Sequence, residues 1–310
     1  MNIVFFGSGR FAVKSLEALV SAGHNIALVV TQPDKPKGRR LNSLPTEVKI
    51  KARELALSIY QPQNPNSQEA VDYLQKFPAD VFMVIAYGHI LKNPLLGLPK
   101  LYPLNVHASL LPKYRGAAPI SWAIINGEKE TGISVIKMNE LIDAGDMLLQ
   151  KKLAIEQDDT AQTLEEKLAI LAARATLEAI ETIGKGSMKF IGQEVGQEAS
   201  FAPKLEKNHG LINWNNDALN IVNQIRGLIP WPGAFTYYKG KLVKIWSARV
   251  SENKEAAKAA RILSISKKGL VIGCAKGALE IRELQLQGGK RLSTEAFLAG
   301  HKLVVGDKLG

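Results

Sequence analysis

The chain has 310 residues, of which 46% are hydrophobic and 22% charged, a balance typical of soluble globular proteins and a length that favours two domains. The N-terminus lacks a basic segment followed by an apolar segment and a cleavage site, and no apolar run reaches membrane-spanning length, so we expect a cytoplasmic protein without membrane contact. Cys274 is the only cysteine and the five histidines are scattered, which excludes a disulfide framework and predicts no metal site.

The first part of the chain alternates strand and helix patterns. In chain order, we predict strand 2–6, helix 11–23, strand 25–32, helix 46–57, strand 58–62, helix 67–77, strands 79–88 and 101–109, helix 118–127, strands 133–140 and 146–156, and helix 160–184. Thr46 and Ser67 are expected to cap the helices that follow them. This βαβα order predicts an α/β fold with a Rossmann-like, doubly wound and mostly parallel sheet over residues 1–188.

The periodicity stops over residues 189–205, which we interpret as a linker. A helix is predicted over 216–229, closed by the segment Pro230-Trp231-Pro232. Short β-like runs punctuated by glycine then follow, at 233–240, 241–250, 260–269, 270–274, 278–287 and 303–306. Residues 206–310 are therefore predicted to form a small β-barrel (OB-like) or sandwich domain.

The net charge of +11 is unevenly distributed. Residues 1–203 contain 22 basic and 21 acidic side chains, whereas residues 204–310 contain 18 basic and 8 acidic side chains, a net charge of +10. This asymmetry points to a polyanionic partner, nucleic acid first, although a solvated lysine-rich surface explains the charge equally well.

The first strand is followed by a possible dinucleotide-binding fingerprint. Gly7, Gly9 and Ala12 satisfy G-x-G-x-x-A, but Asp34, the acidic residue near the end of the second strand, follows a proline and lies among basic residues. We therefore favour a tight turn that needs small residues, and keep an NAD-binding oxidoreductase as a remote alternative.

Ligands of open α/β sheets bind beyond the carboxyl ends of the strands, where 84–91, 105–112 and 139–147 are expected to lie. Asn105 and His107 are two residues apart in an extended stretch, so their side chains point to the same side. An amide donor and an imidazole in this arrangement could together hold an oxygen that becomes negative during acyl transfer. A carboxylate from the third segment could orient the histidine or accept a proton.

Four motifs together resemble the 10-formyltetrahydrofolate-dependent formyltransferases, in particular those whose acceptor is methionyl-tRNA. They are Asn105-x-His107, Ser-Leu-Leu-Pro at 109–112, Arg-Gly-Ala-Ala-Pro at 115–119 and Asp143-x-Gly145-Asp146. The similarity runs along nearly the whole chain. One difference lies in the first turn, where Gly9 replaces the usual proline. The resemblance implies transfer of a formyl group from 10-formyltetrahydrofolate to the α-amine of initiator methionyl-tRNA, by a monomer.

The resemblance also implies the site residues. The catalytic trio corresponds to Asn105, His107 and Asp143. The folate-contacting residues correspond to Ser109, Leu110, Leu111, Pro112, Ala86, Tyr87, Gly88 and Ile90. The tRNA-contacting loop 33–45 supplies Lys35, Lys37, Arg39 and Arg40, and the basic C-terminal domain is expected to hold the tRNA backbone.

Several alternatives share parts of this pattern. A glycinamide ribonucleotide formyltransferase would lack the basic C-terminal domain, and a formyltetrahydrofolate hydrolase or dehydrogenase would continue into further domains. An amino-sugar formyltransferase can share the SLLP-like segment and a similar C-terminal part, but has less need of a charge of +10. A tRNA-binding module without catalysis would bind tRNA but transfer nothing.

Overall fold

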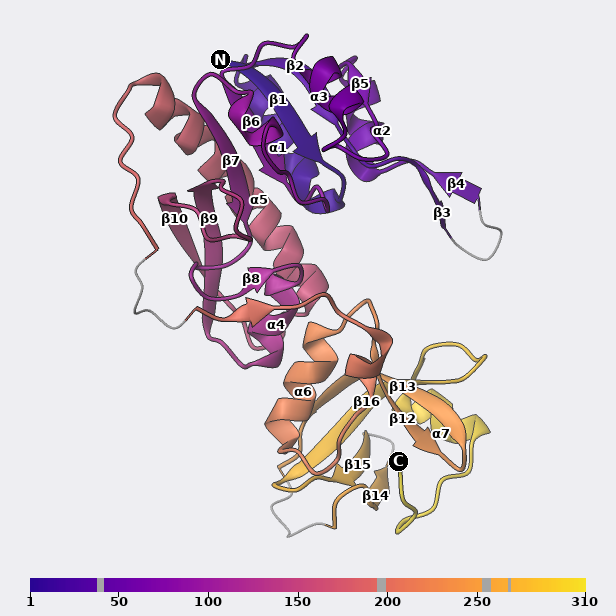
Figure 1. The fold of residues 1–310 in the computed structure, drawn as a ribbon. Helices are drawn as coiled ribbons and strands as arrows, with labels where there is room; N and C mark the ends of the chain where they lie inside the picture. The colour runs from indigo at the N-terminus through magenta and orange to yellow at the C-terminus, as the bar shows by residue number, and fades with distance from the viewer. Residues whose placement is uncertain (38–41, 194–198, 253–257, 267–268) are drawn as a thin grey trace. The chain divides into compact units, whose positions relative to one another are not determined.

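The computed structural model describes residues 1–37, 42–193, 199–252, 258–266 and 269–310. Two compact units account for the described chain (Figure 1). Unit 1 comprises Met1–Pro119, Glu130–Ala154 and Glu165–Pro203, and unit 2 comprises Ile120–Lys129, Ile155–Leu164 and Lys204–Gly310. Within the described ranges, no helix is both long and apolar enough to cross a membrane.

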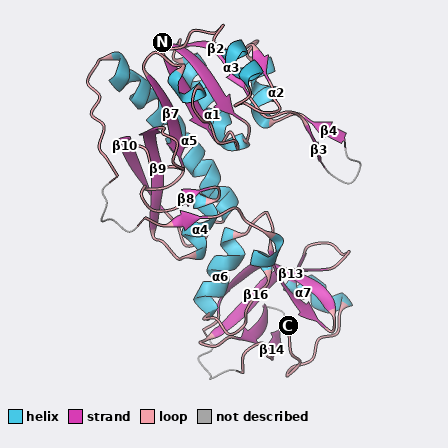
Figure 2. Cartoon of the chain, in the orientation of Figure 1, coloured by secondary structure: helices cyan, strands magenta, loops and turns pink. Residues whose placement is uncertain are grey.

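Unit 1 is built on a sheet of mostly parallel strands, as the sequence predicts (Figure 2). Its strands are β1 (Asn2–Gly7), β2 (Asn25–Val30), β5 (Ile59–Tyr60), β6 (Val81–Ile85), β7 (Tyr102–His107), β9 (Glu130–Lys137) and β10 (Met147–Ala154), in the order β10-β9-β7-β6-β1-β2-β5. The neighbours β7, β6, β1, β2 and β5 are parallel to one another, whereas β9 pairs antiparallel with β7 and β10 pairs antiparallel with β9. The Rossmann-like prediction is confirmed.

Helices follow most of these strands along the chain. They are α1 (Arg10–Ser21), α2 (Glu47–Glu54), α3 (Gln68–Leu74), α4 (Pro119–Ile125) and α5 (Ala161–Gly184). The hydroxyl groups of Thr46 and Ser67 accept hydrogen bonds from the backbone N–H groups of Lys49 and Ala70, so both predicted N-caps are confirmed. All five residues of β6 are buried, as its continuous apolar sequence requires of a central parallel strand.

Strand β1 lies in the middle of the parallel part of the sheet, and successive strands of the chain are added on opposite sides of it, with β2 on one side and β6 on the other. The loops that leave these strands meet there, where the Ser8 N–H donates to the carbonyl of Ala86. Strand β7 lies beside β6 and marks the change from parallel to antiparallel pairing. The chain therefore brings the carboxyl ends of β1, β6 and β7 to one edge of the sheet, the edge at which such folds bind ligands.

Two small sheets in unit 1 are not predicted by the sequence. Strands β3 (Lys35–Lys37) and β4 (Asn42–Leu44) form a hairpin within the basic loop. Strand β8 (Arg115–Gly116) pairs in parallel with β11 (Phe201–Ala202), which belongs to the segment interpreted as a linker. That segment therefore contributes a strand to unit 1.

The C-terminal part of unit 2 is an antiparallel sheet packed against a helix. The sheet contains β12 (Ala234–Tyr238), β13 (Lys241–Val250), β16 (Ala278–Leu286), β15 (Gly269–Gly273) and β14 (Ile262–Ser266), in that order, and β17 (Leu292–Ser293) pairs with β16. Helices α6 (Ala218–Gly227) and α7 (Thr294–Gly300) complete it, with the 3-10 turn Lys207–Gly210 before α6. The predicted run 303–306 contains no strand.

The core of unit 2 is formed by apolar residues of α6 and the sheet, including Ile221, Ile225, Ile245 and Ile281. Cys274 is part of this core, and burial raises the pKa of its thiol to about 11. A thiol held in its neutral form is a poor nucleophile, so the cysteine serves packing.

Candidate active site

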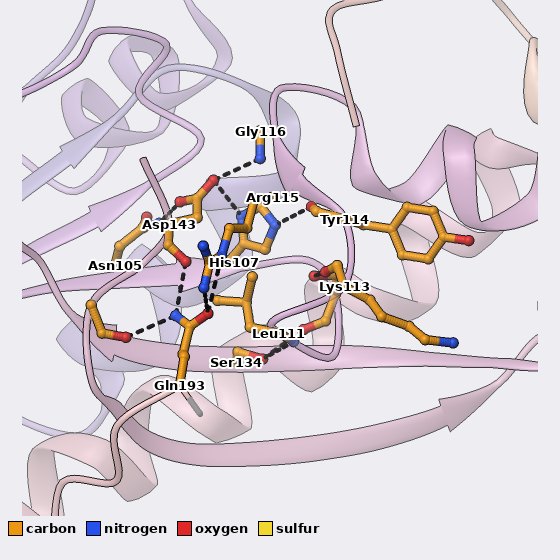
Figure 3. A network of polar contacts seen from close by, with 12 residues as sticks. Asn105, His107, Leu111, Lys113, Tyr114, Arg115, Gly116, Ser134, Asp143 and Gln193 are labelled. Atoms are coloured by element: carbon orange, nitrogen blue, oxygen red, sulfur yellow. Dashed lines mark hydrogen bonds and ion pairs between the residues drawn. The ribbon is translucent and has the colours of Figure 1, made fainter. Parts of the chain in front are cut away.

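Asn105 and His107 lie near the carboxyl end of strand β7, and their side chains point towards the same region (Figure 3). Alternation along the strand places both side chains on one face, as predicted. The Asn105 amide donates to Oδ1 of Asp143 at 3.1 Å, and Nδ1 of His107 lies 3.5 Å from Oδ2 of the same carboxylate. The three predicted catalytic residues are therefore brought together, although the aspartate lies 38 residues beyond the asparagine in the chain.

The His107 ring is 6% exposed and has hydrogen-bond acceptors next to both nitrogens. Nε2 lies 2.8 Å from the carbonyl oxygen of Tyr114. Because a carbonyl only accepts, we assign a proton to Nε2, which then donates to Tyr114. Nδ1 is left facing Oδ2 of Asp143, so a proton on Nδ1 would be directed at the same carboxylate that accepts from Asn105 through Oδ1.

The Asp143 carboxylate is the centre of this arrangement. Besides Asn105 and His107, the backbone N–H of Gly116 donates to Oδ2 at 2.8 Å. The backbone of Asp143 has a φ of 50°, in the left-handed region that is uncommon for residues other than glycine. Such a conformation costs free energy and persists only where the surroundings hold it, which is frequent at functional sites.

The glycine of the Asp-x-Gly-Asp motif is required by a close backbone contact. A Cβ atom on Gly145 would lie 1.8 Å from the carbonyl oxygen of Lys137, the last residue of β9. Strand β9 is joined to the same segment by the Lys137 N–H, which donates to the carbonyl of Asp146 at 2.8 Å. The loop that carries Asp143 can therefore approach the sheet edge only with glycine at position 145.

Gln193 holds this loop and was not predicted from the sequence. Its amide nitrogen donates to the carbonyl oxygens of Asp143 and Gly145, both at 2.8 Å, and its amide oxygen accepts from Nε and Nη2 of Arg115 at 3.2 and 2.6 Å. Figure 3 shows these bonds next to Asn105, His107 and Asp143. A single glutamine in an aperiodic segment gives no sequence signal for this role.

The predicted folate segment 109–112 is a turn fixed to the antiparallel strands. The Ser134 hydroxyl of β9 donates to the carbonyl of Ser109 at 2.7 Å and accepts from the N–H of Leu111 at 3.0 Å. The amide of Gln150 on β10 donates to the Leu111 carbonyl at 2.8 Å. The side chains of Ser109, Leu111 and Pro112 are buried, whereas Leu110 is half-buried and remains available for contact.

The other predicted folate residues follow strand β6. Ala86, Gly88 and Ile90 are exposed, but the Tyr87 ring is buried in the core, edge-on to Phe6 at 5.5 Å. Burial raises the pKa of the Tyr87 hydroxyl. The Tyr87 carbonyl accepts from the Ser8 hydroxyl at 3.1 Å and from the Gln32 amide at 2.8 Å, so a contribution of Tyr87 to a ligand site would come from its backbone.

The predicted tRNA-contacting residues lie in or beside the β3–β4 hairpin. The ammonium group of Lys35 donates to the side-chain oxygen of Gln32 at 2.6 Å. Only the backbone of Lys37 is described, in strand β3, and Arg39 and Arg40 lie outside the described residues.

The first turn serves packing rather than dinucleotide recognition. A Cβ atom on Gly7 would lie 2.8 Å from the Phe5 ring and 3.1 Å from the Ile85 carbonyl, so this position needs glycine whether or not a ligand binds. The Asp34 carboxylate accepts from the Lys49 ammonium at 2.7 Å and from the Gln61 amide at 2.8 Å. These hydrogen bonds lower the pKa of Asp34, and they occupy the group that a ribose hydroxyl would need.

Two family models match the chain. Residues 1–180 match "Formyl transferase" and residues 204–302 match "Formyl transferase, C-terminal domain". Within the described ranges, no group of three or more His, Cys, Asp or Glu side chains could hold a metal ion.

Relatives of similar length carry the name methionyl-tRNA formyltransferase. One from Pelotomaculum thermopropionicum is 46% identical over 311 residues, covering 100% of this chain and 99% of the relative. Another, from Caldanaerobacter subterraneus, is 44% identical, covering 99% of each chain.

Solved structures of sugar N-formyltransferases have the same fold. WlaRD, described as a sugar 3N-formyl transferase in the presence of dTDP and 5-N-formyl-THF, has a TM-score of 0.67 at 21% identity and covers 91% of this chain and 96% of its own. The N-formyltransferase from Helicobacter canadensis, described in complex with folinic acid and dTDP-3-aminofucose, has a TM-score of 0.69 at 18% identity over 94% and 99% of the two chains. From the two family models and the full-length relatives, we conclude that the chain belongs to the formyl transferase family.

Proposed function

We propose that the protein transfers a formyl group from 10-formyltetrahydrofolate to the α-amino group of methionyl-tRNA, the reaction after which its full-length relatives are named. The folate supplies the formyl carbon, and the amine forms a new C–N bond as the bond from that carbon to folate N10 breaks. One proton must leave the attacking amine and one must reach N10. The protein therefore has to stabilise negative charge on the formyl oxygen and move a proton.

The convergence of donors on the Asp143 carboxylate is the observation that carries this proposal. The Asn105 amide and the Gly116 N–H donate to the carboxylate oxygens, and Nδ1 of His107 faces them. An amide NH₂ group has two protons, so Asn105 can keep its bond to Asp143 and direct the second proton at a formyl oxygen. A donor placed in advance on the oxygen that becomes negative is commonly worth roughly 10²–10³ in rate.

Asp143 and His107 are suited to the proton movement. The carboxylate lies beside the imidazole and is partly exposed, so it can accept a proton from the amine directly or through water. The Tyr114 carbonyl fixes the ring through Nε2, which keeps Nδ1 directed at the reaction site. The exposed Ala86, Gly88 and Ile90, with Leu110, are proposed to contact the folate.

The acceptor is assigned from the names of the relatives, and the charge of unit 2 is consistent with it. Residues 204–310, which form most of unit 2, have a net charge of +10, and we propose that they bind the phosphate backbone of the tRNA. The basic hairpin of Lys35 and Lys37, with Arg39 and Arg40, is proposed to contact the acceptor end. A sugar N-formyltransferase activity is the second candidate, because solved structures with that activity share the fold.

One transfer assay separates the two candidates. 10-Formyltetrahydrofolate labelled in the formyl group is supplied with methionyl-tRNA and, separately, with a dTDP-amino sugar, and the label is followed in each acceptor. We expect label on the methionyl amine and none above background on the sugar. Label on the sugar alone would replace the proposal with the second candidate, and label on neither acceptor would reject both.

A further inference from the structure

The segment that leads out of helix α5 is fixed to the active site at two points. At the first point, the backbone of Ile191 exchanges two hydrogen bonds with Met147, at 2.8 and 2.9 Å. At the second, the Ser200 carbonyl accepts from the Arg115 N–H at 2.9 Å, and the Ser200 hydroxyl accepts from the Tyr114 N–H at 2.9 Å. The first point lies beside the loop of Asp143, and the second supports the residues whose backbone contacts His107 and Asp143.

Gln193 connects these two parts of the site through its side chain. Its two amide protons are both used, one on the carbonyl of Asp143 and one on the carbonyl of Gly145. Its oxygen receives two N–H groups of the Arg115 guanidinium. One planar amide thus fixes the backbone of Asp143 and Gly145 and the side chain of Arg115. Arg115 precedes Gly116, and the Gly116 N–H donates to the Asp143 carboxylate.

This bonding acts on a part of the site with an uncommon backbone conformation. Asp143 has a positive φ, and a loop in such a conformation relaxes unless its carbonyl groups are held. The amide of Gln193 holds two of them and is itself oriented by Arg115. The alternative is that Gln193 only stabilises unit 1. Its removal would then lower kcat no more than the removal of another side chain that joins two distant backbone segments of the same unit.

We propose that Gln193 is a positioning residue for Asp143, which acts through the backbone of residues 143–145 and through Arg115 without touching either substrate. The inference rests on the proposed function of Asp143. It predicts that Gln193→Ala lowers kcat for formyl transfer by about 10- to 100-fold, because small displacements of a reacting group have effects of that size. The KM values for folate and for tRNA should change less than about threefold, since no substrate contact is removed.

Two further variants define the control and the mechanism. The control is Asp80→Ala, which removes a carboxylate that accepts from the backbone N–H of Asn2 at 2.8 Å, at the amino edge of the same sheet. This variant should lower Tm and leave kcat unchanged. Gln193→Glu keeps an acceptor for Arg115 but places a carboxylate oxygen, in place of two N–H donors, against the carbonyls of Asp143 and Gly145, so it should reproduce the kcat loss. A wild-type kcat in Gln193→Glu would overturn the proposal.

A double-mutant cycle measures whether Gln193 acts through Asp143. In an Asp143→Ala background, adding Gln193→Ala should lower the single-turnover rate by less than about threefold, because the group to be positioned is gone. An equal loss in both backgrounds would show that Gln193 acts independently of Asp143 and would overturn the proposal.

Amide hydrogen exchange gives a readout that does not depend on the substrate. Gln193→Ala should accelerate exchange in residues 141–146 more than in the central strands of the same sheet. Faster exchange in a protein that transfers no formyl group to methionyl-tRNA would reject the proposed function and leave the positioning role supported. Unchanged exchange in these residues would overturn the positioning role whatever the activity.

Discussion

Replacing Gly145 with alanine tests how strongly catalysis depends on the position of the loop that carries Asp143 relative to strand β9. The added Cβ would lie 1.8 Å from the Lys137 carbonyl oxygen and 2.9 Å from its carbon, and both are backbone atoms that cannot rotate away. An ordinary contact begins at 3.4 Å, so the loop and the end of β9 would have to separate by about 1.6 Å.

A separation of this size would displace Asp143, the carboxylate to which we assign a catalytic role. Asp143 is two residues from Gly145, and the Gly145 carbonyl is one of the two held by Gln193. Because a misplacement of about 1 Å costs roughly 10²-fold in rate, we expect Gly145→Ala to lower kcat by about 10²-fold or more. Overpacking should also lower the free energy of unfolding by about 1–3 kcal/mol.

The assay is single-turnover formyl transfer to methionyl-tRNA, with the unfolding midpoint measured on the same samples. Gly97→Ala is the matched control, since a Cβ at Gly97 meets nothing within 4 Å and its φ is not positive. We expect that control to keep the wild-type rate. A folded Gly145→Ala protein with a wild-type rate would refute the claim that the position of this loop determines catalysis.

Three further predictions concern stability and binding. Tyr87→Phe should raise the free energy of unfolding by about 1 kcal/mol in a denaturant titration, because the buried Tyr87 hydroxyl has no hydrogen-bond partner among the described residues; a loss of stability would contradict this. Burial raises the pKa of Glu165 above 4.5, so the folded state binds the proton more tightly and ionisation at neutral pH opposes folding. Glu165→Gln should therefore raise the free energy of unfolding at pH 7, by an amount that shrinks as the pH falls through the raised pKa. An equal gain at pH 7 and at a pH below that pKa would be inconsistent with this assignment. The affinity for tRNA should fall by roughly 10³-fold between about 50 and 200 mM salt if about six phosphates are contacted, and a salt-independent affinity would exclude the role given to residues 204–310.

The parallel sheet could be predicted from the sequence because its central strands are buried on both faces and two of its helices, α2 and α3, begin at side-chain caps. Continuous apolar runs such as 81–85 and hydroxyl groups such as those of Thr46 and Ser67 are local signals. The hairpin in the basic loop gives no such signal, since Pro36 lies within β3 and polar residues surround it. The run 303–306 has the composition of a strand but finds no partner strand, and pairing rather than propensity decides.

The candidate site could be predicted in part. Asn105 and His107 follow from alternation along one strand, and the expectation that strand ends meet at one edge places a carboxylate of segment 139–147 beside them. The resemblance to the formyltransferases is what singles out Asp143 among the carboxylates of that segment. The contacts of Tyr114 and Gly116 are made by backbone atoms, which any residue has, so the sequence does not mark them. Gln193 lies in an aperiodic segment, and its role depends on a long-range contact with a loop 50 residues earlier.

The most direct test of the central claim is the single-turnover rate of formyl transfer from 10-formyltetrahydrofolate to methionyl-tRNA in the wild type and in Asn105→Ala, His107→Ala and Asp143→Ala. With tRNA affinity measured in parallel, we expect each variant to bind tRNA as the wild type does and to lose roughly 10²-fold or more in rate. A variant of His107 or Asp143 that transfers at near the wild-type rate would contradict the assignment of these residues to catalysis.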